Sequence, residues 1–222
     1  MFISKRQLPP TLKRLEIYNC ENLQFLIDEG EASSLLTKEE SINSNASLLE
    51  HLHIRDCPSL KCVLLRGDLF AKLKLIEIWN CLELTSLSSS NQLPIALKKL
   101  VVLDWPKLES LADNLHNNVS LECLRIRNCK EIKFLPEGLH KLYHLNYISI
   151  GDCCSLVSFP VGGFLPTHLT KLSIWCCEKL EALPRMHMVT SLQIYKCPSI
   201  VSLPEREVFL IQKVRNENMQ QT

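Results

Sequence analysis

Residues 12–26 read LKRLEIYNCENLQFL, and the spacing of the apolar residues in this stretch decides the fold. Written with x for any residue, the pattern is L-x-x-L-x-I-x-x-C-x-x-L-x-x-L. Alternation over the L-x-I segment predicts a short strand whose leucine and isoleucine point to one side while their neighbours point to the other. The two leucines after the cysteine then return the chain over the same apolar core. The apolar and thiol positions are Leu12, Leu15, Ile17, Cys20, Leu23 and Leu26.

The same pattern occurs eight times along the chain of 222 residues. Its copies begin at residues 12, 49, 73, 97, 121, 145, 169 and 189, so five of the seven spacings are 24 residues. One copy cannot cover its own apolar face, and regularly spaced copies therefore stack on one another. We expect residues 8–204 to form an α/β-type repeat solenoid of eight units. Its strands should form a curved parallel β-sheet on the concave face.

The segments behind the strands should be mostly extended or 3₁₀, because Leu-Pro pairs such as Leu135-Pro136 interrupt helices. The long first spacing marks an insertion at residues 28–47, whose Ser, Glu and Asn content predicts an exposed loop. Residues 205–222 carry no repeat and are expected to be a polar C-terminal tail. Few residues precede Leu12, so we expect further repeats or another domain upstream to cover the first coil.

Cysteine occupies the ninth position of the pattern in seven copies, and Trp105 takes that place in the fourth. A small, weakly polar side chain suits an interior shared by stacked coils. A zinc site needs four convergent ligands, whereas this arrangement supplies one thiol per coil, so no metal site is expected. Asn or Asp precedes the ninth position in six copies, which predicts a turn capped by a side-chain hydrogen bond. These residues are Asn19, Asp56, Asn80, Asp104, Asn128 and Asp152.

The amino-acid composition indicates which kinds of partner the chain could bind and in which cellular compartment it is expected. The chain has 25 Lys and Arg against 24 Asp and Glu, so its charge favours neither nucleic acid nor an anionic membrane as partner. Lys5 and Arg6 interrupt the start of the chain before a signal peptide could form, and no apolar stretch is long enough to span a membrane. Eleven cysteines without a secretion signal indicate reduced thiols and a cytoplasmic protein.

The outward strand positions predict a protein-binding face. They fall into three columns, which hold six Lys or Arg against two Glu and many aromatic side chains. Aromatic residues and arginine supply much of the energy at protein interfaces, although the same side chains could instead cover one another along the sheet. We therefore expect a face that prefers an acidic partner surface. The candidate binding residues are Tyr18, His53, Arg55, Trp79, Arg125, Arg127, Tyr147, Trp175 and Tyr195.

Catalysis is not expected, because no motif assembles a convergent set of reactive groups. His51 and His53 share a strand face near Glu77, but outward residues of neighbouring strands meet through sheet geometry alone. We expect a binding protein that is not an enzyme and that has no cofactor of its own.

The stretches LKRLEIYNCENLQFL (12–26), LPEGLHKLYHLNYISIGDC (135–153) and FLPTHLTKLSIWCCEKLEALP (164–184) carry a resemblance to a known family. They resemble the C-terminal leucine-rich repeats of plant nucleotide-binding disease-resistance proteins of the coiled-coil class. The resemblance covers residues 8–204 and implies a leucine-rich-repeat horseshoe. The chain has no G-x-x-x-x-G-K-[ST] phosphate loop and no coiled-coil heptads, so ADP or ATP is expected only in a nucleotide-binding domain outside this sequence.

The resemblance implies a role in plant innate immunity. The expected partners are a pathogen effector or a guarded host protein, and the receptor's own nucleotide-binding domain, which the repeats would hold inactive. The alternative is the substrate-recognition region of an F-box-type ubiquitin ligase adaptor, whose repeats also contain cysteine. Such units tend to carry helices behind the strand and lack Leu-Pro pairs, and no F-box-like segment occurs here. An extracellular receptor would instead have a signal peptide and paired cysteine caps.

Overall fold

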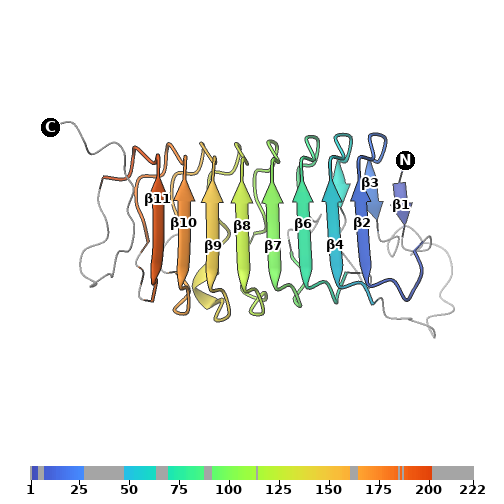
Figure 1. Ribbon diagram of the computed structural model, residues 1–222, viewed down its shortest axis with the longest axis horizontal. Coiled ribbons are helices and arrows are strands. Elements are labelled where there is room, and N and C mark those ends of the chain that lie inside the picture. Colours follow the sequence, from blue (N-terminus) through green and yellow to red (C-terminus); the bar gives the residue numbers. More distant parts are fainter. Residues whose placement is uncertain are drawn as a thin grey trace.

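The chain folds into a parallel β-solenoid in a computed structural model (Figure 1). The structure describes residues 2–4, 8–27, 48–63, 70–87, 92–113, 115–160, 165–184, 186 and 188–201. Their strands form a parallel sheet in the order β11-β10-β9-β8-β7-β6-β4-β2, so each new coil adds one strand beside the last. The eight strands are β2 (Arg14–Tyr18), β4 (His51–Arg55), β6 (Leu75–Trp79), β7 (Lys99–Leu103), β8 (Cys123–Arg127), β9 (Tyr147–Gly151), β10 (Lys171–Trp175) and β11 (Ser191–Tyr195).

The register of this sheet is the one that the repeat predicts. Ile17 pairs with Ile54 and Ile54 with Ile78, and the same row continues to Ile194 through all eight strands. Every member of the row is at most 5% exposed. Burying an isoleucine of this kind contributes about 1.5–3 kcal/mol. The prediction of stacked repeats with an aliphatic interior is confirmed.

The ninth position of each unit explains why cysteine recurs there. From Cys57 to Cys197, these thiols lie within hydrogen-bond distance of the carbonyl oxygen two residues earlier, as in Cys81 to Trp79 O at 3.5 Å and Cys153 to Gly151 O at 3.3 Å. Trp105 replaces the thiol with an indole N–H, which donates to the carbonyl of Leu84. Both side chains combine an apolar body with one donor, so they fit a closed interior that contains a backbone oxygen.

The residue before the ninth position adopts a left-handed conformation in every coil, with φ between 51° and 55°. Asn and Asp tolerate this conformation better than other residues with a side chain, which accounts for their recurrence. The turn itself is present at every site, but no side-chain cap of the predicted kind is seen there among the described residues, and at two sites the side chain joins neighbouring coils. Asn80 Nδ2 donates to Asp56 Oδ1 at 2.8 Å, and Asn128 Nδ2 donates to Asp104 Oδ1 at 2.8 Å.

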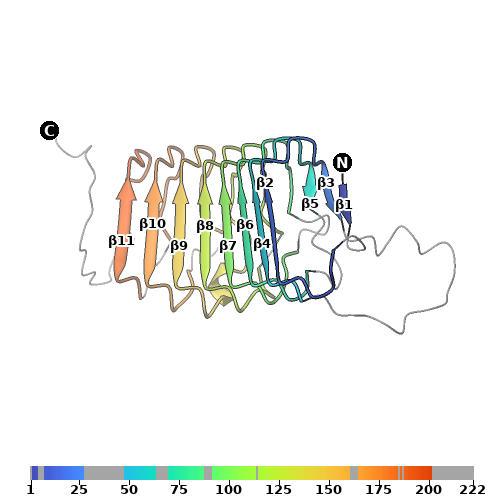
Figure 2. The same ribbon diagram turned by 45° about the vertical axis from the view of Figure 1, so that its right-hand side comes forward.

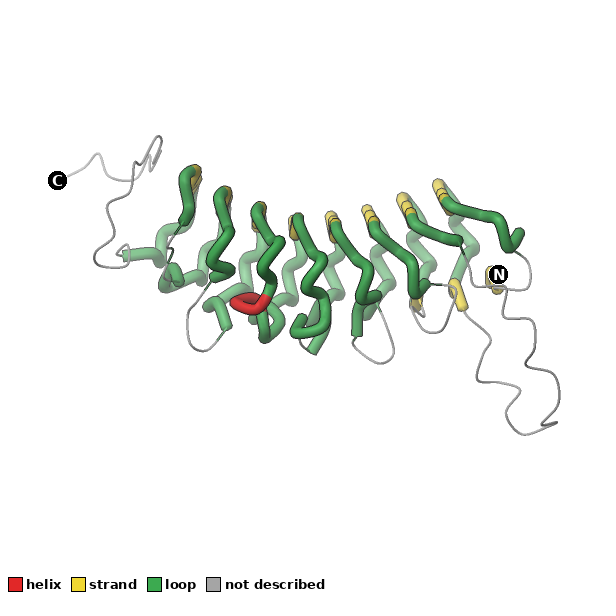
Figure 3. Tube along the Cα trace, turned by 90° about the horizontal axis from the view of Figure 1, so that it is seen from below, coloured by secondary structure: helices red, strands yellow, loops and turns green. Residues whose placement is uncertain are grey.

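The chain behind the strands is almost free of helix, as predicted. Within the described ranges the single helix is a 3₁₀ turn, η2 (Leu139–Lys141). Viewed along the strands, the large sheet lines one side of the molecule and the connecting segments fill the other (Figure 3). No helix in the described part of the chain is long and apolar enough to cross a lipid bilayer.

A second, smaller sheet was not predicted. It has the order β1-β3-β5 and consists of β1 (Phe2–Ser4), β3 (Phe25–Ile27) and β5 (Cys62–Val63), at the same end as β2 (Figure 2). Because β1 pairs with β3 and Ile3 packs against the core, residues 2–4 partly cover the first coil, for which we had expected a cover only from further repeats or another domain. The predicted insertion at residues 28–47 and tail at residues 205–222 lie outside the described residues.

Candidate protein-binding surface

The outward face of the eight-stranded sheet carries all nine candidate binding residues. The pairing of strands aligns them in the three predicted columns, because each strand is in register with the next. None of the nine is buried: Tyr18, Arg55, Arg125 and Arg127 are exposed, and His53, Trp79, Tyr147, Trp175 and Tyr195 are partly exposed.

Some outward side chains cover their neighbours along the sheet, as the second interpretation of the columns predicts. The ring of Trp175 lies directly over Gly151, where a Cβ atom would be 2.0 Å from Cε2 of the indole. The guanidinium of Arg55 lies 5.2 Å from the ring centre of Trp79, which is a cation–π distance. Ser149 and Ser173 occupy outward strand positions and are nevertheless buried. The face is therefore closely packed in places and open in others.

The positive charge of this face is smaller than the residue count indicates, because most of its cations are in ion pairs. Four of the six Lys and Arg side chains have a carboxylate partner, and two of those partners, Asp56 and Asp152, lie in the turns just after the strands. The pairs are Arg14–Glu16 at 3.7 Å, Arg55–Asp56 at 3.0 Å, Lys99–Glu77 at 2.7 Å and Arg127–Asp152 at 3.2 Å.

Arg125 and Lys171 are the two cations of the columns that form no ion pair within the described part of the chain. Arg125 lies over the ring of Tyr147 at 5.9 Å, and Lys171 is the strand partner of Tyr147. Tyr147 thus has one unpaired cation over its ring and a second on the neighbouring strand. We call this group the β8–β10 patch.

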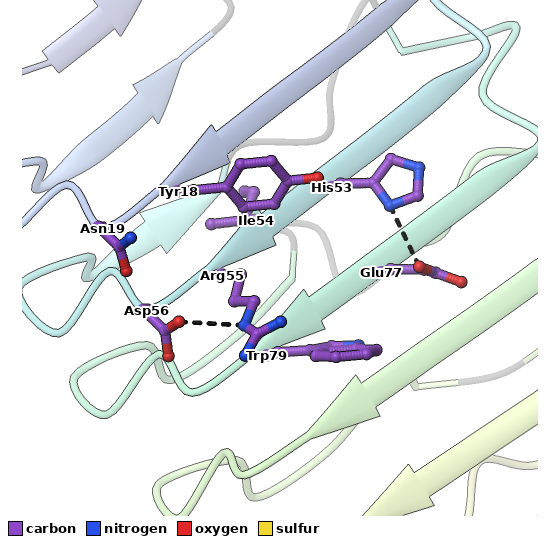
Figure 4. Close-up of a pocket in the computed structure, with 8 residues that line it drawn as sticks. All are labelled: Tyr18, Asn19, His53, Ile54, Arg55, Asp56, Glu77 and Trp79. Carbon is purple, nitrogen blue, oxygen red and sulfur yellow. Dashed lines mark hydrogen bonds and ion pairs between the residues drawn. The ribbon is translucent and has the colours of Figure 1, made fainter.

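A hollow of about 400 Å³ lies near the ends of β2, β4 and β6 (Figure 4). Its walls combine the aromatic rings of Tyr18 and Trp79 with charged groups from β4, from β6 and from the turn after β4. Partial desolvation and then the carboxylate of Glu16 raise the pKa of the Tyr18 hydroxyl. The lining residues are Tyr18, Asn19, His53, Ile54, Arg55, Asp56, Glu77 and Trp79.

The two carboxylates of this hollow are already engaged. Glu77 Oε2 lies 3.1 Å from His53 Nδ1, and its Oε1 accepts from Lys99 Nζ at 2.7 Å. Asp56 Oδ2 accepts from Arg55 Nε at 3.0 Å, and its Oδ1 accepts from Asn80. The proximity of His53 and Glu77 thus belongs to a network that spans three strands, and Glu77 is held on both oxygens.

Cys81 and Cys153 are poor nucleophiles, because the apolar interior disfavours the thiolate. Burial raises the pKa of Cys81 to about 12 and that of Cys153 to about 11. Among the described residues, no three His, Cys, Asp or Glu side chains are arranged to hold a metal ion. The outward face presents hydrogen-bonding groups, charged groups and aromatic rings.

Sequence reasoning missed two features of this surface. The neutralising roles of Asp56 and Asp152 could have been found by counting the residue after each strand along with the strand itself. The hollow could not have been predicted from the sequence, because it depends on the rotamers of Tyr18, Arg55 and Trp79.

No protein-family model matches the chain, and a search of curated proteins found no match either.

Proposed function

We propose that the outward face of the sheet binds proteins and that the chain is the leucine-rich-repeat region of a plant intracellular disease-resistance receptor. The observation that carries the proposal is the register of the sheet. It buries the aliphatic and thiol positions of every repeat and leaves rows of Trp, Tyr and Arg on the open side. Such rows are the residue types that dominate protein interfaces.

The assignment to the receptor class rests on the sequence resemblance and is supported by the shape of the repeats. Leucine-rich-repeat horseshoes with extended backs are what the resemblance implies, and the described back carries one 3₁₀ turn. The F-box adaptor alternative calls for helices behind the strands and is therefore less well supported. In the receptor, this region would contact an effector or a guarded host protein and the nucleotide-binding domain, in the cytoplasm.

The β8–β10 patch is the part of the face best suited to an acidic partner. Its cations, Arg125 and Lys171, are not neutralised by ion pairs within the described residues, unlike Arg127. A cation without a partner loses less on binding than one that must leave an existing ion pair. We therefore place the preference for acidic surfaces here rather than across the whole face.

The assignment to the receptor class is tested by sequencing the complete transcript that encodes these residues. A phosphate-loop motif upstream supports the receptor, and an F-box segment contradicts it. The nucleotide-binding domain encoded there would then be expressed separately and its association with this chain measured by co-precipitation at two salt concentrations.

Charge reversal tests the face itself. The double variant Arg125→Glu with Lys171→Glu should weaken association and reduce its dependence on salt. Lys130→Glu is the matched control, because Lys130 is an exposed cation outside the strands. Equal effects of the double variant and the control, or no effect of either, would contradict the proposed binding face.

A further inference from the structure

The cysteines at the ninth position differ in exposure at one end of the solenoid. Cys20, in the coil of β2, is partly exposed, whereas the other six are buried. Its neighbour in the next coil is Cys57, which is 0% exposed. The strands that precede these two residues are paired in register, with Tyr18 opposite Arg55. The row of buried thiols therefore meets solvent at Cys20.

The thiols of Cys20 and Cys57 are in contact. Cys20 Sγ lies 3.5 Å from Tyr18 O, and Cys57 Sγ lies 3.4 Å from Arg55 O, so the two side chains have the same orientation in their coils. Cys57 Sγ also lies 4.0 Å from the carbonyl oxygen of Ile17, in the coil of Cys20, and it is hydrogen-bonded to the Cys20 thiol. Paired strands are about 4.8 Å apart, and the Cα atoms of a disulfide are about 4.4–6.8 Å apart. The spacing of the coils therefore suits a disulfide between these residues.

Cys57 has a second neighbour in the row, Cys81, in the coil of β6. The register is the same on this side, because Arg55 also pairs with Trp79. Cys81 is 0% exposed, and burial raises its pKa to about 12, so it presents little thiolate to an oxidant. Exposure therefore favours Cys20 over Cys81 as the first residue to be oxidised.

We propose that Cys20 and Cys57 form a modification site, at which hydrogen peroxide converts the two free thiols into a disulfide. This site goes beyond the proposed function and does not depend on it. The Cys20 thiolate attacks one oxygen of the peroxide and the O–O bond breaks. The hydroxide that leaves takes up the proton that the thiol lost and becomes water, and Cys20 is then a sulfenic acid.

Cys57 completes the reaction as the resolving thiol. Its sulfur attacks the sulfur of the Cys20 sulfenic acid, the S–O bond breaks, and the hydroxide that leaves takes up the Cys57 proton as a second water. The two thiols together lose two electrons and two protons, and one peroxide becomes two waters. A small thiol reductant such as glutathione reverses the disulfide by thiol–disulfide exchange.

The disulfide joins the edge coil of the solenoid to its neighbour. β2 is the last strand of the large sheet, so within this sheet its coil is paired on one side only. Elements at an end open more readily than interior ones. A bond between Cys20 and Cys57 resists that opening and also restricts the unfolded chain. Oxidation should therefore raise the urea concentration at which the protein unfolds.

The test is a peptide map of the full chain after oxidation. The reduced protein is treated with hydrogen peroxide, its remaining thiols are blocked with N-ethylmaleimide, and it is digested with trypsin without a reductant. Trypsin places Cys20, Cys57 and Cys81 on the separate peptides 15–38, 56–61 and 75–98, each of which contains one cysteine. We expect mass spectrometry of the monomeric protein to find peptide 56–61 joined to 15–38 and not to 75–98. Cys57 thus reports its choice between two neighbours in the same molecule.

Cys57→Ala tests the order of the two steps. Without the resolving thiol, the sulfenic acid of Cys20 should persist, and dimedone, which reacts with sulfenic acids, should label peptide 15–38 more than in the wild-type protein. Cys81→Ala is the matched control, because it removes the other neighbour of Cys57 and should leave the disulfide and the dimedone labelling unchanged. If a variant does not fold, the wild-type peptide map decides alone.

Three results would each overturn the inference. The first is a map in which peptide 56–61 is joined to 75–98 as often as to 15–38. The second is the absence of any disulfide between Cys20 and Cys57 after oxidation of the folded protein. The third is equal labelling of Cys20 by dimedone in the wild-type protein and in a folded Cys57→Ala variant.

Discussion

The contact between Gly151 and Trp175 gives a sharp test of how the outward face is packed. A Cβ atom at residue 151 would lie 2.0 Å, 2.1 Å and 2.5 Å from three atoms of the Trp175 indole. Carbon atoms at rest are about 3.5–4.0 Å apart, so Gly151→Ala forces the ring to leave its position. Overpacking of this kind costs about 1–3 kcal/mol. Gly151 does not have a positive φ, so the backbone itself would accept alanine.

The assay is urea unfolding followed by far-ultraviolet circular dichroism, in a double-mutant cycle with Trp175→Ser. In the wild-type background, Gly151→Ala should lower the free energy of unfolding by about 1–3 kcal/mol. With serine at residue 175 the indole ring is absent, so the atoms nearest the new Cβ are gone. Gly151→Ala should then be neutral, or it should stabilise the protein by about 0.4–1 kcal/mol because alanine lowers the conformational entropy of the unfolded chain. The reasoning is refuted if Gly151→Ala costs the same in both backgrounds.

Three further predictions concern the coils, each measured by the same unfolding assay. Ile78→Ala should lower the free energy of unfolding by about 2–5 kcal/mol, because it opens a cavity in the buried row; a loss no larger than that of Leu75→Ala, on the outward side of the same strand, would contradict the buried row. Trp105→Phe should cost about 1–3 kcal/mol, because it keeps a ring but leaves the carbonyl of Leu84 without its donor; a neutral result would show that this bond contributes nothing. Cys176→Asn should stabilise the protein by about 1 kcal/mol, because residue 176 has a positive φ and asparagine there could donate to Asp152 as Asn128 does to Asp104. A destabilised Cys176→Asn variant would argue that neither the left-handed backbone of residue 176 nor a hydrogen bond to Asp152 favours asparagine there.

The sequence was sufficient to predict the solenoid, the register and the columns, since these follow from two periods. The alternation within each strand decides which residues point inward, and the longer period of the repeat places Ile54 beside Ile78. It was also sufficient to predict that the nine candidate residues lie on an open face. Their role in binding, and the identity of the chain as a leucine-rich-repeat receptor region, remain predictions.

Other features depend on geometry that the pattern does not contain. Cys176 and Lys196 adopt the left-handed conformation with a positive φ, although neither residue type favours it, because the stacking of coils fixes the turn. The strand at Phe25–Ile27 forms only because β1 and β5 are placed on either side of it. The ion pairs of Arg55 and Arg127 depend on side-chain rotamers, which a count of charges along the chain does not include.

Alkylation of the native protein, read by mass spectrometry on the peptide that contains Cys153 and Cys154, tests the central claim most directly. These adjacent thiols differ in burial: Cys153 is 0% exposed in the interior of the solenoid, and Cys154 is partly exposed. Burial also raises the pKa of Cys153 to about 11, which leaves little thiolate to react. We expect iodoacetamide to label Cys154 first in the folded protein and both residues at similar rates in urea. Equal labelling of the two thiols in the native state would contradict a buried, stacked interior behind the outward face of the sheet.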